Sequence, residues 1–268
     1  MKNQLLLWAF VAMFTACQTA ENKEASPSDQ EEIAVNPAAP GFNEAASDPE
    51  AIAIADEVME AMGGRAAWDR TQFIYWSFFG RRTLLWDKFN QRVRINVPGD
   101  SMLYLIDLAE GTGMVMKNGE ALEQLDSLAK YVKQGQSIWI NDAYWLVMPY
   151  KLKDSGVTLK YVGQGTTQNG KTAEVVMLTF ERVGDTPQNK YKVYVDPESK
   201  LVIQWDFYSD AADEQPRFTT PWEGYQDFHG ILLSAGRGEN SLSEIAVYSK
   251  VPTTAFTDFA SPAMETFE

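Results

Sequence analysis

The combination in this chain that is best suited to catalysis is a histidine with an aspartate two residues before it. His229 is the only histidine, and Asp227 precedes it. A histidine oriented by a carboxylate can act as a general base toward a serine, and Ser234 and Ser241 follow along the chain. No Gly-x-Ser-x-Gly motif surrounds either serine, and a hydrogen-bonded structural histidine is the alternative interpretation. We therefore expect no catalytic residue and no enzymatic activity.

Acidic side chains are the other groups that could do chemistry. Four of them lie close together and could bind a hard cation through oxygen atoms: Asp206, Asp210, Asp213 and Glu214. Their spacing differs from an EF-hand loop, and a solvated turn after a strand explains them equally well. Others could form the carboxylate pair of a glycoside hydrolase, although the sequence fixes no separation: Asp142, Asp154, Glu181 and Glu223. We expect no bound metal ion and no cofactor.

The single cysteine, Cys17, follows a positive charge at Lys2 and an apolar stretch over residues 5–14 that is too short to span a bilayer. The stretch Phe14-Thr15-Ala16-Cys17 resembles the bacterial lipobox, in which the cysteine receives a diacylglycerol thioether and becomes the new N-terminus. Phe14 departs from that pattern, because leucine is the usual residue. We expect residues 1–16 to be a lipoprotein signal peptide and Cys17 to be lipidated. The alternative is a secreted protein with an unpaired thiol.

Residues 17–47 are predicted to be the lipidated cysteine and a disordered acidic tether. Residues 18–50 hold eight acidic side chains against Lys23 alone, and few large apolar residues that could support a core. The formal net charge of -14 argues against nucleic acid as a partner. Gln18 follows the cysteine, where aspartate would mark retention in the inner membrane, so the outer membrane of a Gram-negative-type envelope is favoured. The tether would hold the protein away from the lipid surface.

A single domain is expected over residues 48–268, and a helix should open it. Ser47-Asp48-Pro49-Glu50 offers an N-cap, a proline at the first helical position and acids near the positive end of the helix. Apolar residues then recur at helical spacing as far as Met62, and Gly63-Gly64 ends the run. Two further helices are predicted, over residues 122–132 and 137–148.

Strand patterns dominate the rest of the domain. Apolar residues alternate with other residues over 74–78, 93–97, 102–106, 175–180, 191–195 and 201–207. Asn-Gly pairs at 118–119 and 169–170 are typical of type I′ hairpins, and a turn is expected over 196–200. We predict an α+β, mostly β fold with a curved antiparallel sheet that is partly covered by a few helices.

Several sequence motifs resemble the LolA/LolB-like superfamily of periplasmic lipoprotein carriers and lipoproteins related to them. They occur in the same order over most of residues 50–250: Met62–Trp68, Trp139–Leu152, Tyr194–Pro197 and Tyr225–Ile231. The resemblance implies an unclosed half-barrel with helices over its concave, apolar face, and binding of lipid or acyl chains there. Its soluble carriers lack a lipid anchor, so a shuttle function does not follow for this chain.

Aromatic side chains are dense on strands that are apolar on both faces, as in residues 73–79. They could simply form the core, or part of the concave face could hold an apolar ligand. The candidate lining residues are Trp76, Phe78, Trp86, Tyr104, Trp145, Trp205 and Phe207. Arg81-Arg82 could meet an anionic headgroup at the mouth of that site, or form an exposed turn.

Three functional hypotheses follow. The first is a membrane-anchored, monomeric lipoprotein that binds a lipid, an acyl chain or another apolar ligand in a half-barrel cavity. The second is a scaffold lipoprotein whose core is filled by its own side chains and whose function lies on its outer surface. The third is a hydrolase that uses His229 or a carboxylate pair.

Overall fold

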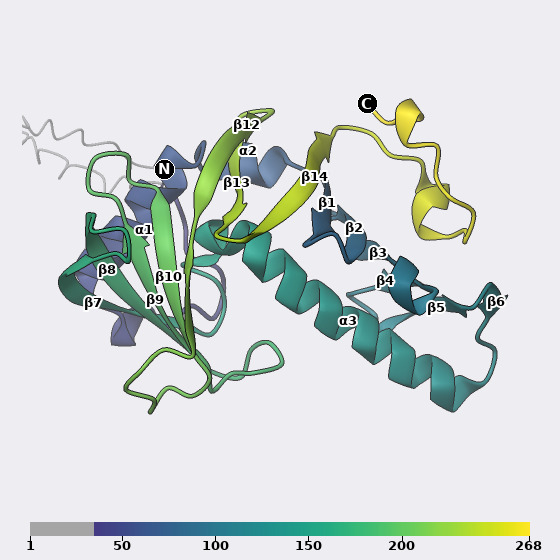
Figure 1. Ribbon diagram of the computed structural model, residues 1–268, viewed down its shortest axis with the longest axis horizontal. Coiled ribbons are helices and arrows are strands. Elements are labelled where there is room, and N and C mark those ends of the chain that lie inside the picture. Colours follow the sequence, from purple (N-terminus) through teal and green to yellow (C-terminus); the bar gives the residue numbers. More distant parts are fainter. Residues whose placement is uncertain (1–34) are drawn as a thin grey trace, which may run out of the picture. The chain divides into compact units, whose positions relative to one another are not determined.

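Two antiparallel β-sheets and three α-helices make up residues 35–268, the part of the chain that this computed structural model describes (Figure 1). The expected signal peptide, Cys17 and the tether as far as residue 34 lie outside the described residues. The mostly β, antiparallel and unclosed α+β fold expected from the strand patterns is confirmed. The strands form two sheets, however, and not one.

The larger sheet has nine strands in the order β12-β13-β14-β1-β2-β3-β4-β5-β6. Its strands are β1 Phe73–Phe78, β2 Arg82–Asp87, β3 Arg92–Val97, β4 Met102–Asp107, β5 Thr112–Lys117, β6 Glu120–Ala121, β12 Glu223–Phe228, β13 Ile231–Arg237 and β14 Asn240–Tyr248. Neighbours from β1 to β6 are consecutive in sequence, as hairpins require. Strand β14 then returns to pair with β1.

The smaller sheet has five strands in the order β11-β10-β9-β8-β7. They are β7 Val157–Thr166, β8 Thr172–Phe180, β9 Lys190–Val195, β10 Val202–Tyr208 and β11 Phe218–Pro221. Only Trp222 separates β11 from β12, so the chain passes from one sheet to the other within a single residue. The Trp222 backbone amide donates to the Ile203 carbonyl at 2.9 Å, and its side chain is buried.

The predicted first helix is α1, Pro49–Ala61. Asp48 is its N-cap residue, but the Asp48 side chain makes no capping hydrogen bond. It accepts hydrogen bonds from the Lys160 ammonium at 2.8 Å and the Tyr161 amide at 3.0 Å, and so joins α1 to β7. A second short helix, α2, Arg65–Arg70, was not predicted.

A single long helix, α3, Leu125–Val147, replaces the two predicted helices over 122–132 and 137–148. The glycine at its middle, Gly135, is compatible with an unbroken helix because it allows close packing. A Cβ added there would lie 3.0 Å from Ile106 Cγ1 and 3.1 Å from Tyr104 Cδ1. The helix therefore has no break between the two predicted segments, and Gly135 lies where α3 packs against β4. A 3-10 turn, η3 Met148–Lys151, follows and contains Pro149.

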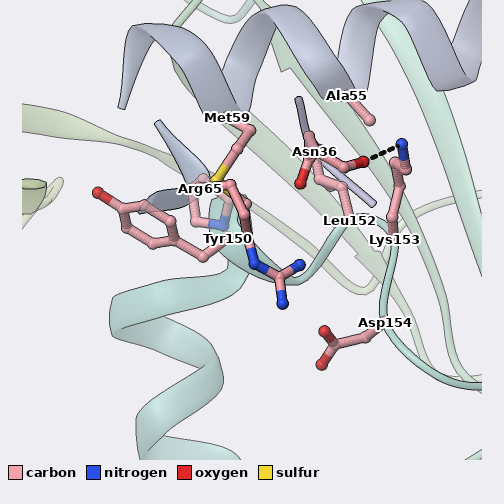
Figure 2. Close-up of a pocket in the computed structure, with 9 residues that line it drawn as sticks. Asn36, Ala55, Met59, Arg65, Tyr150, Leu152, Lys153 and Asp154 are labelled. Carbon is pink, nitrogen blue, oxygen red and sulfur yellow. Dashed lines mark hydrogen bonds between the residues drawn. The ribbon is translucent and has the colours of Figure 1, made fainter. Parts of the chain in front are cut away.

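The packed part of the chain begins before residue 48, where the tether was expected to end. The Lys153 ammonium donates to the Asn36 carbonyl at 2.7 Å (Figure 2). The Ala39 amide donates to the Lys153 carbonyl at 2.9 Å. The 3-10 turn η1, Glu44–Ala46, then leads into α1. Residues 35–47 contain few large apolar side chains, so composition pointed to a tether, but backbone hydrogen bonds attach them to the domain.

One of the two predicted type I′ turns is confirmed and the other is not. Asn118 and Gly119 both have positive φ, 52° and 84°, which confirms the type I′ turn between β5 and β6. In the loop after β7, Gly170 has positive φ of 77° but Asn169 is not among the positive-φ residues, and the Thr167 amide donates to the Lys171 carbonyl at 2.9 Å. This loop is therefore wider than the predicted type I′ turn.

Helix α3 lies along one face of the nine-stranded sheet, where it contacts β3, β4 and β5 and reaches β13 (Figure 1). Alternate residues of β1–β5 face α3 and form the main hydrophobic core with it. The opposite face of that sheet carries a smaller cluster of Phe73, Leu85, Val251, Ala255 and Phe256. Two 3-10 turns lie in the segment over this face, η4 Thr253–Phe256 and η5 Met264–Thr266, and a third, η2 Pro98–Asp100, joins β3 to β4.

Candidate functional site

The structure divides the seven predicted lining residues into two groups. The first group lies beneath α3 on the nine-stranded sheet: Trp76, Trp86 and Tyr104 are 0%, 8% and 1% exposed. Trp86 packs edge-on against Trp139 of α3 with ring centroids 5.5 Å apart. These rings belong to the packed core, so a helix of the chain itself occupies the place where a ligand was expected.

The second group lies where the end of α3 meets the five-stranded sheet. Trp145 of α3 has its ring centroid 6.3 Å from that of Phe78 and 4.9 Å from that of Trp205. Phe207 joins the same group through Phe218, which lies 4.9 Å from Phe207 and stacks on Trp145 at 5.8 Å. The structure therefore brings Phe78, Trp145, Trp205 and Phe207 together, apart from the other three.

We call the partly exposed rings of this group the aromatic row: Phe79, Trp145, Phe218, Phe207, Tyr191 and Phe180. Each ring contacts the next, with centroid separations of 5.4, 5.8, 4.9, 5.2 and 5.8 Å in that order. The row thus runs from the end of β1, across α3, to four strands of the five-stranded sheet. Phe218 is 37% exposed, and the other five rings are half-buried.

Strand pairing explains why these rings line up. Phe218, Phe207 and Tyr191 stand opposite one another on β11, β10 and β9, because Phe207 is paired with Phe218 and also with Tyr191. Side chains of directly paired residues share one face of a sheet and lie close together. The turn from β1 to β2 adds Phe79, which has an unusual positive φ of 51°.

Two buried polar atoms beneath the row have no hydrogen-bond partner among residues 35–268: the Tyr144 hydroxyl and Trp205 Nε1. The Tyr144 ring lies 5.9 Å from Trp205 and 5.4 Å from Tyr191. Burial raises the pKa of Tyr144 well above its ordinary value, so the hydroxyl stays protonated and able to donate. A buried donor without an acceptor is unusual in a folded protein, and five other side chains among residues 35–268 have such an atom: Trp76, Arg92, Trp139, Trp222 and Arg237.

Comparisons with known proteins assign this chain to no family. No protein-family model matches this sequence, and no curated protein matches it significantly. Among solved structures the chain is similar to a DUF1329 family protein from Desulfovibrio piger, with a TM-score of 0.44, 14% identity, and coverage of 78% of this chain and 98% of that chain. It is also similar to MucB, with a TM-score of 0.24, 15% identity, and coverage of 82% of this chain and 63% of that chain. A structure of MucB in complex with MucA(peri) gives a TM-score of 0.22 and 13% identity over 80% of this chain and 60% of that chain.

The residues proposed for hydrolysis are placed in structural roles. His229 occupies the tight turn between β12 and β13 with a positive φ of 57°, and Asp227 accepts a hydrogen bond from the Gly230 amide at 3.2 Å. Ser234 is fully buried on β13, and its hydroxyl donates to the Glu223 carbonyl at 2.7 Å. Ser241 is exposed on β14. These contacts leave His229 as a turn residue.

Two of the carboxylates proposed for metal binding or glycoside hydrolysis bind other side chains of the domain. Asp142 is fully buried in α3 and pairs with Arg82 at 2.5 and 2.6 Å, so Arg82 binds a carboxylate of the chain and not a headgroup. Asp206 is buried and accepts from Tyr194 and Thr219 at 2.8 Å. Among residues 35–268, no three His, Cys, Asp or Glu side chains are arranged to hold a metal ion.

Two hollows accompany these features, and neither is lined by the aromatic row. One of about 10 Å³ lies between α1, η3 and the segment around Asn36, where Arg65, Lys153 and Asp154 surround it (Figure 2). That volume suffices for about one water molecule. The other, of about 400 Å³, lies on the face of the nine-stranded sheet opposite α3. In the part of the chain that the structure describes, no helix is both long and apolar enough to cross a membrane.

Four of the six residues of the aromatic row were not among the predicted site residues: Phe79, Phe180, Tyr191 and Phe218. Phe180 and Tyr191 did lie within predicted strands, but the pairing of β9 with β10 was needed to place Tyr191 beside Phe207. Phe218 lies on a four-residue strand with no alternating pattern of its own. A signal was available in the two aromatic residues of β10, Trp205 and Phe207, which share a face and require aromatic or apolar neighbours across the strands.

Proposed function

We propose that this chain is a non-enzymatic lipoprotein of the bacterial envelope that acts by binding a partner protein through its aromatic row. In this proposal Cys17 carries the lipid anchor, the outer membrane is its location, and the domain presents the row to an apolar segment of the partner. The function is therefore that of an interaction or scaffold protein whose own side chains fill its core.

The observation that supports this proposal best is the position of α3. The helix covers three of the seven rings that were expected to line a lipid cavity, and Trp76 and Tyr104 beneath it are at most 1% exposed. A carrier needs a hollow that buries most of its ligand. With α3 in place, the concave face of the nine-stranded sheet offers packed side chains, and binding must use another surface.

The aromatic row has the chemistry of a contact surface. Clusters of exposed apolar side chains mark interaction sites, and aromatic residues are enriched at the centres of protein interfaces. Aromatic side chains contribute a large contact area while few rotatable bonds are frozen on binding. Phe218, the most exposed ring, contacts both Trp145 and Phe207, so its position is fixed before a partner arrives.

A second candidate function, binding of a lipid acyl chain by the same row, is favoured by the unpartnered Tyr144 hydroxyl and Trp205 Nε1. A ligand with a polar atom could satisfy one of these donors while its chain lies against the rings. This alternative retains the acyl-chain binding implied by the LolA/LolB-like resemblance, but the ligand would lie against the aromatic row and not on the face covered by α3.

Native mass spectrometry of the protein extracted from membranes in mild detergent tests both candidates. Phe218→Ser removes the most exposed ring of the row, and Phe89→Ser is the matched control, because Phe89 is 53% exposed and lies in the turn between β2 and β3. We expect a partner protein to be retained by the wild type and by Phe89→Ser and lost from Phe218→Ser. A lipid retained with the same dependence on Phe218 would support the second candidate, and retention that is equal in all three proteins would exclude both.

A further inference from the structure

A second site lies on the face of the nine-stranded sheet opposite α3, beneath residues 251–268, which we call the strap. The hollow of about 400 Å³ between strap and sheet is within the size range of small-molecule pockets, about 300–1,000 Å³. We infer that this hollow binds a single-chain amphiphile with an anionic head, of the fatty-acid class. The inference is independent of the aromatic row and of any partner bound there.

The strap is fixed at both ends, so the space beneath its middle is maintained by the fold. Arg94 is 7% exposed and donates to four backbone carbonyls of the strap, those of Ala255, Asp258, Phe259 and Ala260, at 2.8 to 3.2 Å. At the other end the Glu268 amide donates to the Lys250 carbonyl at 3.2 Å. Residues 259–264 bridge the hollow between these two attachments.

The floor of the hollow is a lane of outward-facing side chains on four adjacent strands. Thr83 is paired with Asn96, Asn96 with Leu103, and Leu103 with Met116, so the four residues form one row across β2, β3, β4 and β5. Neighbouring strands lie about 4.8 Å apart, which makes the lane about 14 Å long. One end of the lane is polar and the other is apolar, as a molecule with a head and a tail requires.

The roof matches the apolar end of the floor. Phe259, Pro262 and Met264 of the strap line the hollow together with Leu103 and Met116 of the sheet. Methionine side chains are flexible and polarizable, so they adapt to a linear chain without a fixed shape. An alkyl chain between these residues would remove apolar surface from water on both sides, at about 25 cal/mol per Å² of buried area.

The charges near the hollow indicate the sign of the charge on the ligand's head group. Within the part of the chain that the structure describes, the residues that line the hollow include Arg94 and no aspartate or glutamate, although the whole chain has a net charge of -14. Two carboxylates lie just outside the lining: Asp258 is near Arg94, and Glu244 accepts a hydrogen bond from Tyr75. All four polar contacts of the Arg94 guanidinium are with carbonyl groups, so its positive charge has no carboxylate at ion-pair distance among residues 35–268. An anionic head near Thr83 and Asn96 would be attracted by that charge, and a cationic head would be repelled.

Photoaffinity labelling tests the inference on the full chain in nanodiscs of phosphatidylethanolamine and phosphatidylglycerol. The probe is a photoactivatable dodecanoate, whose extended chain matches the lane, with unlabelled dodecanoate as competitor. We expect competable adducts on residues that line the hollow, in β4, β5 and the strap. Adducts on the aromatic row alone, or adducts spread over the surface, would overturn the inference, and neither result would bear on partner binding by the row.

Two variants on the same strand and the same face sharpen the test. Met116→Asp places a carboxylate in the hollow, whereas Met114→Asp places it on the outward face of β5 at a residue that is 41% exposed and does not line the hollow. We expect labelling to fall about tenfold in Met116→Asp, equivalent to about 1.4 kcal/mol, and to change less than about twofold in Met114→Asp. Equal labelling of the two variants would contradict the site.

Two controls distinguish loss of the site from loss of the fold, and an anionic head from a cationic one. Ser261→Trp fills the mouth of the hollow from an exposed position on the strap, so it should abolish labelling while leaving the sheet intact, as circular dichroism would verify. A photoactivatable dodecylammonium should label the hollow at least about tenfold less than dodecanoate, an effect of the size expected for a change of charge sign near an arginine. Equal labelling by the two probes would overturn the anionic assignment.

Discussion

Trp145 of α3 packs edge-on against Trp205 of β10, with ring centroids 4.9 Å apart and an interplanar angle of 77°. This contact joins the helix that covers the nine-stranded sheet to the inner face of the five-stranded sheet. Close by, Arg237 of β13 donates to the Trp145 carbonyl at 2.6 Å, near the negative end of the helix. The end of α3 is therefore held in place, and the rings around Trp145 have a defined arrangement.

Gly135→Val tests whether α3 is packed tightly against β4. The new side chain branches at Cβ, where Ile106 and Tyr104 already lie within 3.1 Å, so we expect the free energy of unfolding to fall by about 1–3 kcal/mol. The matched control is Gln134→Val, at an exposed neighbouring position, where only the small loss of helix propensity should appear. Chemical denaturation measures both variants, and equal losses would mean that the helix is not in contact with the sheet at Gly135.

Arg82→Met removes the partner of the fully buried Asp142. Burial raises the pKa of Asp142, and the hydrogen bonds and charge of Arg82 partly offset this rise. Without Arg82 we expect a loss of about 3–5 kcal/mol of stability at neutral pH. The folded-state pKa of Asp142 would then lie further above the unfolded value, so the loss should shrink as the pH falls and the carboxyl becomes neutral.

The double variant Arg82→Met/Asp142→Leu provides the control for that experiment. It removes both charges, so we expect it to recover most of the lost stability and to show no extra dependence on pH relative to the wild type. If the double variant is as unstable as Arg82→Met at every pH, the ion pair is not the reason for the loss.

Lys88 should make the free energy of unfolding rise with pH, whereas the raised pKa of Asp142 makes it fall with pH. Burial lowers its pKa to about 8, and its ammonium lies 4.6 Å from the Trp68 ring centroid. The unfolded chain therefore binds more protons than the folded chain between about pH 8 and the unfolded lysine value of about 10.4, so the Lys88 contribution to stability rises with pH through that window. We expect the stability of the wild type relative to Lys88→Met to increase between pH 7 and pH 10. Lys133→Met, on the exposed face of α3, should show no such change.

Cys17→Ala tests the proposed lipid anchor. We expect the variant to leave the membrane fraction after cell fractionation, because the thioether can no longer form and no other anchor is proposed. Its melting temperature should match that of the wild-type domain, since the anchor residue takes no part in the core proposed for residues 35–268. Continued membrane association of the variant would contradict lipidation at Cys17.

The alternation of apolar residues was sufficient to predict six of the fourteen strands, and helical spacing was sufficient to predict the first helix, because both patterns are local. The turn motifs between strands indicated the antiparallel pairing. The prediction divided α3 into two helices, and no local pattern reveals the contact of Gly135 with Ile106 and Tyr104. The candidate site was predicted only in part. Trp76, Trp86 and Tyr104 lie together in the core beneath α3, and local spacing alone could not position this helix over them. Phe218 entered the site only through its pairing with Phe207.

The most direct test of the proposed function places a photo-crosslinking amino acid at position 218 in cells and compares it with the same residue at position 89. Both positions are exposed phenylalanines, and only Phe218 belongs to the aromatic row. We expect a discrete protein adduct from position 218 and none from position 89. The absence of a protein adduct at position 218, or equal adducts at both positions, would contradict the proposed function.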